Sequence, residues 1–149
     1  MYKRILVPID GSSTSQRGLR EAIGLAQELK TPAHLILLHV IEPPPQVAEA
    51  GLALDWPVLA RSLREHAQGL LAGAKAECEA AGLTAETELR DAEGRVADTV
   101  VARASARACE LVVLGTHGRR GASRWVMGSD AELVARHSPV PVLLVRSPE

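Results

Sequence analysis

Short aliphatic runs alternate along the chain with segments whose apolar residues recur at helical spacing, and this alternation restricts the fold to few architectures. The runs at 5–9, 34–41 and 111–114 are apolar at nearly every position, as expected of strands covered on both faces of a sheet. The run at 83–89 alternates instead, which is typical of a strand near a sheet edge. We therefore predict five strands, at 5–9, 34–41, 83–89, 111–114 and 140–145.

One amphipathic segment lies in each gap between these runs, bounded by helix start and stop signals. Turn and N-cap residues at 10–13 precede the first segment, and Gly82 is suited to the C′ position of the second. We predict four helices: one that follows residue 13, one that starts at Pro57, one marked by 96–108 and a short one that begins near Gly128.

Strands that alternate with helices in a chain of 149 residues indicate a single α/β domain, residues 1–149, with right-handed crossovers. We predict a doubly wound, mostly parallel five-stranded sheet in the order 3-2-1-4-5, which places 140–145 at an edge. Ligands bind such sheets beyond the carboxyl ends of the strands. The positions to search for function are therefore Asp10, 40–42, 90–93 and the segment from Gly115 onward.

Composition narrows the function classes. The net charge is −1 and aromatic residues make up 2% of the chain, which argues against nucleic acid and anionic membranes as partners. Cys78 and Cys109 are far apart and form no disulfide or zinc pattern, so a reducing cytoplasm is expected. The apolar run after the N-terminus is too short for a signal peptide, and no run reaches transmembrane length.

The segment from Gly115 to Ser129, GTHGRRGASRWVMGS, is the densest chemical signal. Gly115 and Gly118 can take positive φ and let a ligand approach the backbone, and Gly128-Ser129 opens a helix whose first N–H groups favour phosphate. The alternative is a tight loop with solvated arginines. Side chains in the segment add charge: His117, Arg119, Arg120 and Arg124.

This constellation resembles the ATP-binding branch of the universal stress protein family, whose pattern is glycine, two residues, glycine, nine residues and then Gly-Ser or Gly-Thr. Gly115, Gly118 and Gly128-Ser129 match that pattern completely. The resemblance spans essentially the whole chain, and also rests on KRILVPIDGS, LLHVIEP, ELVVLGTHGRRG and ARHSPVPVLLVR. It implies a Rossmann-like fold of the adenine nucleotide alpha hydrolase type.

The resemblance also implies roles for particular residues. Pro8 and Asp10 would border the nucleotide, with Asp10 near the ribose, and Val40 would contact adenine. The phosphates would be held by Gly115, Gly118, Gly128 and Ser129. Two further residues, His117 and Arg119, lie inside the motif.

Asp10 also has an interpretation from the residues alone. A carboxylate just beyond a strand can accept hydrogen bonds from ribose hydroxyls. It can equally cap the first helix or form an Asx turn, and these roles do not exclude one another.

The chain departs from the family pattern after Ser129, where Asp130-Ala131 stand in place of a small apolar or hydroxyl-bearing pair. A carboxylate suits the helix dipole but repels a triphosphate unless Mg²⁺ lies between them. Two hypotheses follow: Asp130 helps to hold Mg²⁺, or it favours AMP or ADP over ATP.

Motifs for other reactions are missing. The sequence contains no GxxxxGK[ST], no GxGxxG after the first strand, no GxSxG and no HExxH. Binding is therefore favoured over catalysis, with slow ATP hydrolysis at most. The resemblance to the universal stress protein family implies a nucleotide-responsive stress regulator that binds ATP. The alternative is a nucleotide-free or AMP-binding dimeric scaffold, and a third possibility is a phosphohydrolase or nucleotide transferase.

Some further residues receive structural interpretations. His34 and His39 are interpreted as hydrogen-bonded core residues, Cys109 as a small hydrophobe, and the Arg and Glu residues of the Ala-rich helices as solvated. The last strand, Val140–Val145, would pair with a second copy to form a homodimer, and the family resemblance implies the same. The roles of Trp125 and of the loop from Pro43 to Trp56 stay open.

Overall fold

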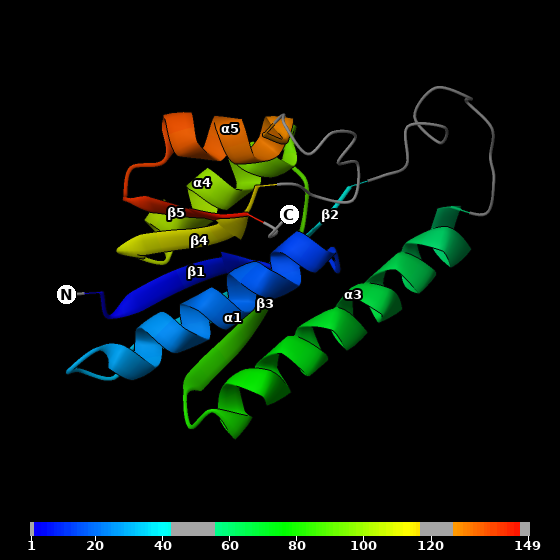
Figure 1. Cartoon of the computed structure of the whole chain (residues 1–149). Helices are drawn as coiled ribbons and strands as arrows, with labels where there is room; N and C mark the ends of the chain where they lie inside the picture. Colours follow the sequence, from blue (N-terminus) through cyan, green and yellow to red (C-terminus); the bar gives the residue numbers. More distant parts are fainter. Residues whose placement is uncertain (1, 43–55, 117–126, 147–149) are drawn as a thin grey trace.

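A five-stranded, all-parallel sheet with the order β3-β2-β1-β4-β5 organises the computed structural model (Figure 1). The structure describes residues 2–42, 56–116 and 127–146. The predicted strand order is therefore confirmed. The strands are β1 (Arg4–Pro8), β2 (His34–Ile41), β3 (Thr84–Asp91), β4 (Leu111–Gly115) and β5 (Val142–Val145).

Helices cover both faces of the sheet, so the predicted double winding is also confirmed (Figure 1). One face carries α1 (Ser13–Glu28) and α3 (Trp56–Ala80). The other carries α4 (Val96–Ala106) and α5 (Ser129–His137). None of the described helices is long and apolar enough to cross a membrane.

The central strands are buried on both faces because successive side chains point to opposite sides of a strand. In β2, Leu35 and Leu37 pack in a cluster beneath α1 and α3. Ile36 and Leu38 pack in a second cluster beneath α4 and α5. This double burial explains the continuous apolar runs in the sequence.

The bounds of β2 match the predicted 34–41, and those of the other strands differ from the predicted ones by at most two residues at either end. Strand β5 begins at Val142 and not at 140, and Pro141, which has no N–H to donate, enters the ladder only as the acceptor for Val112 N, at 3.0 Å. Strand β3 is an edge strand as predicted, but it extends to Asp91. Arg90 and Asp91 are thus part of the strand and not of the loop beyond it.

Candidate functional site

The turn between β1 and α1 holds Asp10 in a defined shape. Asp10 Oδ1 accepts a hydrogen bond from Ser12 N at 2.8 Å, which is an Asx turn. Asp10 N donates to Ser15 Oγ at 3.1 Å. The N-cap of α1 is Ser12, whose Oγ accepts from Ser15 N at 3.1 Å. Of the two structural roles considered for Asp10, the Asx turn is therefore the one observed.

Pro8 and Val40 lie at the carboxyl ends of neighbouring strands. Pro8 is the last residue of β1 and is in register with Leu38 of β2. Val40 is partly buried on the α4 and α5 face, where it packs against the second cluster. Asp10 lies two residues after the end of β1, so the residues expected at the base and ribose approach one edge of the sheet from adjacent strands.

His39 is a hydrogen-bonded core residue, as the sequence predicts. Its side chain is buried, and its Nδ1 lies 2.7 Å from the carbonyl oxygen of Ile9. The prediction did not identify the partner, which is the carbonyl of the residue before Asp10. The motif LLHVIEP contains His39, but only the fold brings it to the first loop.

Gly115 ends β4, and the structure gives it a different reason for lacking a side chain. A Cβ at this position would lie 2.6 Å from both the carbonyl carbon and the carbonyl oxygen of Thr14. Gly115 is not among the glycines with positive φ, so that expectation is wrong. Its absent Cβ lets the first turn of α1 approach the end of β4.

The two ends of the glycine-rich segment lie beside each other at the same edge. Thr116 is buried, its N donates to Val145 O at 2.9 Å, and its O accepts from Gly128 N at 2.8 Å. The chain therefore leaves and returns to one point between β4, β5 and α5. Several residues singled out in the sequence lie outside the described residues: His117, Gly118, Arg119, Arg120, Arg124, Trp125 and 43–55.

Gly128 is the N-cap of α5, as expected of a helix that begins near it, and Glu132 N donates to its carbonyl at 3.0 Å. Ser129 and Asp130 are exposed in the first turn. Ala131, which follows Asp130, is buried in the second cluster. Exposed Asp130 thus lies in the first turn of α5, where the N–H groups of a helix favour negative charge.

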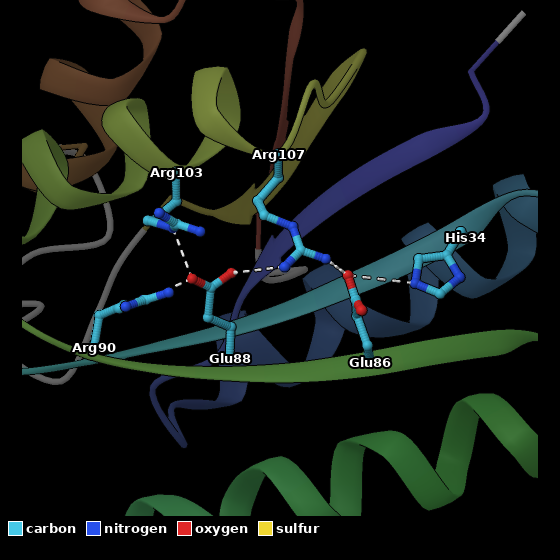
Figure 2. A network of polar contacts seen from close by, with 6 residues as sticks. All are labelled: His34, Glu86, Glu88, Arg90, Arg103 and Arg107. Atoms are coloured by element: carbon cyan, nitrogen blue, oxygen red, sulfur yellow. Dashed lines mark hydrogen bonds and ion pairs between the residues drawn. The ribbon is translucent and has the colours of Figure 1, made fainter.

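A charged network lies on the α4 side of β3, away from these loops (Figure 2). The Glu88 side chain is only 8% exposed, and its Oε1 lies 2.6 Å from Arg90 Nε and 2.7 Å from Arg103 Nε. Glu86 contacts Arg107. Arg103 of α4 and Arg107, the C-cap of α4, are therefore partly buried against the sheet, which corrects the expectation that the charged residues of this helix are solvated.

His34 belongs to the same network and is not a core residue, contrary to its interpretation (Figure 2). Its side chain is 34% exposed at the start of β2, with Nε2 3.5 Å from Glu86 Oε1. Burial lowers the pKa of His34 below its ordinary value, and Arg4 and Arg107 lower it further.

Both cysteines are buried and unpaired, as expected. Cys109 lies in the second cluster, which confirms its interpretation as a small hydrophobe. Burial raises the pKa of the Cys78 thiol to about 11 and also raises the pKa of Cys109. Among the described residues, no group of three or more His, Cys, Asp or Glu is arranged to hold a metal ion.

Comparison with known proteins identifies the family to which this chain belongs. A model of the universal stress protein family matches residues 1–146, and the chain belongs to that family. The fold is accordingly the universal stress protein fold of the adenine nucleotide alpha hydrolase-like type.

Two curated relatives show the extent of the similarity. The chain is 33% identical over 151 residues to universal stress protein MJ0531 of Methanocaldococcus jannaschii, covering 100% of this chain and 85% of the relative. It is 31% identical to a universal stress protein of Thermus aquaticus, covering 98% of this chain and 100% of the relative.

Solved structures are similar over the whole chain. The structure of hypothetical protein MJ0577 aligns with a TM-score of 0.87 and 27% identity, covering 100% of this chain and 99% of that chain. A universal stress protein in complex with cAMP aligns with a TM-score of 0.70 and 28% identity, with 99% of each chain covered.

Proposed function

We propose that this protein binds an adenine nucleotide, ATP with Mg²⁺, at the carboxyl edge of the sheet, and that it acts in the cytoplasm as a nucleotide-responsive regulator of the stress response. One observation carries the proposal: the Asp10 turn, the end of β2 at Val40 and the joined ends of the glycine-rich segment share one edge. A relative of the same fold is in complex with cAMP, which supports an adenine nucleotide.

Each part of the proposed ligand has a partner of suitable chemistry. Pro8, Asp10 and Val40 border the nucleoside, with Asp10 at the ribose and Val40 at the base. Gly115, Gly118, Gly128 and Ser129 line the phosphates, where His117 and Arg119 add charge. Helix N-termini and glycine-rich turns favour phosphate because their N–H groups are available to it.

The test uses a substitution that preserves the local turn. In Asp10→Asn the amide oxygen still accepts from Ser12 N, but one carboxylate oxygen and the charge are lost. We expect calorimetric titration with Mg·ATP to show binding by the wild type and about tenfold weaker binding by Asp10→Asn. The matched control is Asp98→Asn, because Asp98 also accepts a backbone hydrogen bond, from Arg95 N at 3.3 Å.

Three results distinguish the candidate functions. ATP released by denaturing the purified protein, or heat on titration with Mg·ATP, supports the regulator, whereas released AMP alone supports the AMP-binding scaffold. No retained nucleotide and no binding heat favour the scaffold, in which the dimer surface is the working part. Multiple turnovers of ATP that disappear in Asp10→Asn indicate a phosphohydrolase, and our proposal expects slow hydrolysis at most.

Asp130 sets the preference among nucleotides in this proposal. Its exposed carboxylate in the first turn of α5 suits Mg²⁺ placed between it and the phosphates, and without Mg²⁺ it repels them. We expect Asp130→Ala to bind ATP more tightly than the wild type when Mg²⁺ is absent, and to lose the gain in affinity that Mg²⁺ provides. This role is excluded if Asp130→Ala and the wild type have the same affinity for each of ATP, ADP and AMP, with and without Mg²⁺.

The protein is proposed to form a homodimer through 140–145. Strand β5 is an edge strand, and the N–H and C=O groups on its outer side belong to Val142 and Leu144, since Pro141 and Val145 bond to β4. Leu143, 40% exposed, adds apolar surface to this edge.

A further inference from the structure

His39 connects two parts of the proposed site that come from different strands. It lies in β2 directly before Val40, it is 5% exposed, and its Nδ1 lies 2.7 Å from Ile9 O. A carbonyl oxygen can only accept, so the proton of this hydrogen bond is on Nδ1 and the imidazole donates.

This bond completes the attachment of Ile9 to β2. Ile9 N donates to Leu38 O at 2.7 Å, and Ile9 O accepts from His39, so both backbone groups of Ile9 are bonded to consecutive residues of β2. Ile9 is itself buried, at 4% exposure. The point from which the Asp10 turn starts is therefore fixed by β2, and the turn itself is fixed by Ser12 and Ser15.

His39 reaches the site through the backbone and not through its own contact with a ligand. Side chains alternate along β2: Leu35 and Leu37 lie in the cluster under α1 and α3, and Leu38 and Val40 pack on the other face. His39 thus lies on the α1 and α3 face, opposite the Val40 side chain. It is suited to holding the Asp10 turn at a set position relative to the end of β2.

We propose that His39 is a positioning residue of the nucleotide site, which couples the Asp10 turn to the end of β2 so that ribose and base are recognised together. The inference rests on the proposed function, because it presumes that Asp10 and Val40 contact the nucleotide. It adds a residue to which the family resemblance assigns no role, and gives it a task that a core histidine does not have.

The test compares two substitutions that differ in where the donor lies. The amide nitrogen of Asn corresponds to Nδ1, whereas that of Gln corresponds to Nε2. We expect His39→Asn to keep the affinity for Mg·ATP within about twofold of the wild type, and His39→Gln to weaken it about tenfold, the effect of one lost hydrogen bond. Equal affinity in the Gln variant and the wild type would overturn the proposal.

A double-mutant cycle separates positioning from general stability. If His39 acts through Asp10, His39→Gln in the Asp10→Asn background changes the affinity by less than about twofold, because the contact it positions is already impaired. A merely structural role predicts the same weakening in both backgrounds, together with lower urea midpoints, and that result refutes the inference.

A measurement on the wild type does not depend on whether the variants fold. Saturation with Mg·ATP is expected to shift the His39 Nδ1–H resonance in NMR spectra, and no shift overturns the inference. The two proposals also fail in different ways. No binding of Mg·ATP by the wild type refutes the proposed function. Binding that Asp10→Asn weakens but His39→Gln does not refutes only the role of His39.

Discussion

Gly115 shows at the scale of one residue how a close backbone contact excludes a side chain. We expect Gly115→Ala to lower the free energy of unfolding by about 1–3 kcal/mol, because its Cβ would clash with the Thr14 carbonyl and force α1 to move. Gly24→Ala is the control, since a Cβ there meets nothing within 4 Å and alanine favours a helix. Urea unfolding followed by circular dichroism measures both, and equal midpoints for Gly115→Ala and the wild type would contradict the clash.

The buried thiols lead to a second prediction for single residues. Because burial raises the pKa of Cys78 to about 11 and that of Cys109 above its ordinary value, almost no thiolate is present at neutral pH. We expect neither thiol of the native protein to react with Ellman's reagent within minutes, and both to react in guanidinium chloride. Rapid labelling of the native protein would show that a buried cluster opens.

Glu88 joins two elements, β3 and α4, so its effect belongs to the scale of secondary structure. Removing its charge in Glu88→Gln leaves Arg103 and Arg107 without their buried partner, and we expect a loss of about 2–3 kcal/mol in unfolding free energy. The control is Glu132→Gln, which breaks the exposed pair with Arg136 and is expected to cost less than about 0.5 kcal/mol. If Glu88→Gln loses as little unfolding free energy as Glu132→Gln, the network adds no stability.

His34 makes the same region sensitive to pH. Its pKa is lower in the folded protein than in the unfolded chain, so protonation favours unfolding. The contribution of neutral His34 to the free energy of unfolding is fully present above about pH 6.5, the pKa in the unfolded chain. This contribution is lost as the pH falls through the folded-state pKa. We expect the urea midpoint to fall between about pH 7.5 and pH 5.5, and to fall less in His34→Gln. An identical pH dependence in the two proteins would exclude His34 as the cause.

The two edges of the sheet differ at the scale of the whole molecule, and this difference is the basis for the proposal that a second copy pairs at β5. Strand β3 carries charged side chains that oppose edge pairing, whereas β5 is apolar. We expect Leu143→Arg to convert the proposed dimer to a monomer. Val58→Arg is the control, because Val58 is an apolar residue that is 62% exposed on α3. Light scattering gives the mass, and an unchanged dimer in Leu143→Arg would exclude this edge.

The sequence by itself determined the elements, their order, the double burial of the central strands and the edge position of β3, because periodicity is a local property that each segment carries. It also identified Asp10 and Gly128, since turn and cap residues act over a few positions, and Val40, because it lies at the end of an apolar run. Their binding roles stay predictions.

Only the tertiary structure decided which distant residues meet. The contact of His39 with Ile9, the ion pairs of Glu88 with Arg103 and the packing of Gly115 against Thr14 each join residues from different elements. No local pattern specifies such a pair, because the partner is set by strand register and by how closely a helix packs on the sheet. From sequence alone, charged residues on a helix are therefore interpreted as solvated, and glycines at a strand end as facing a ligand. The fold corrects both interpretations by showing which residues lie next to them.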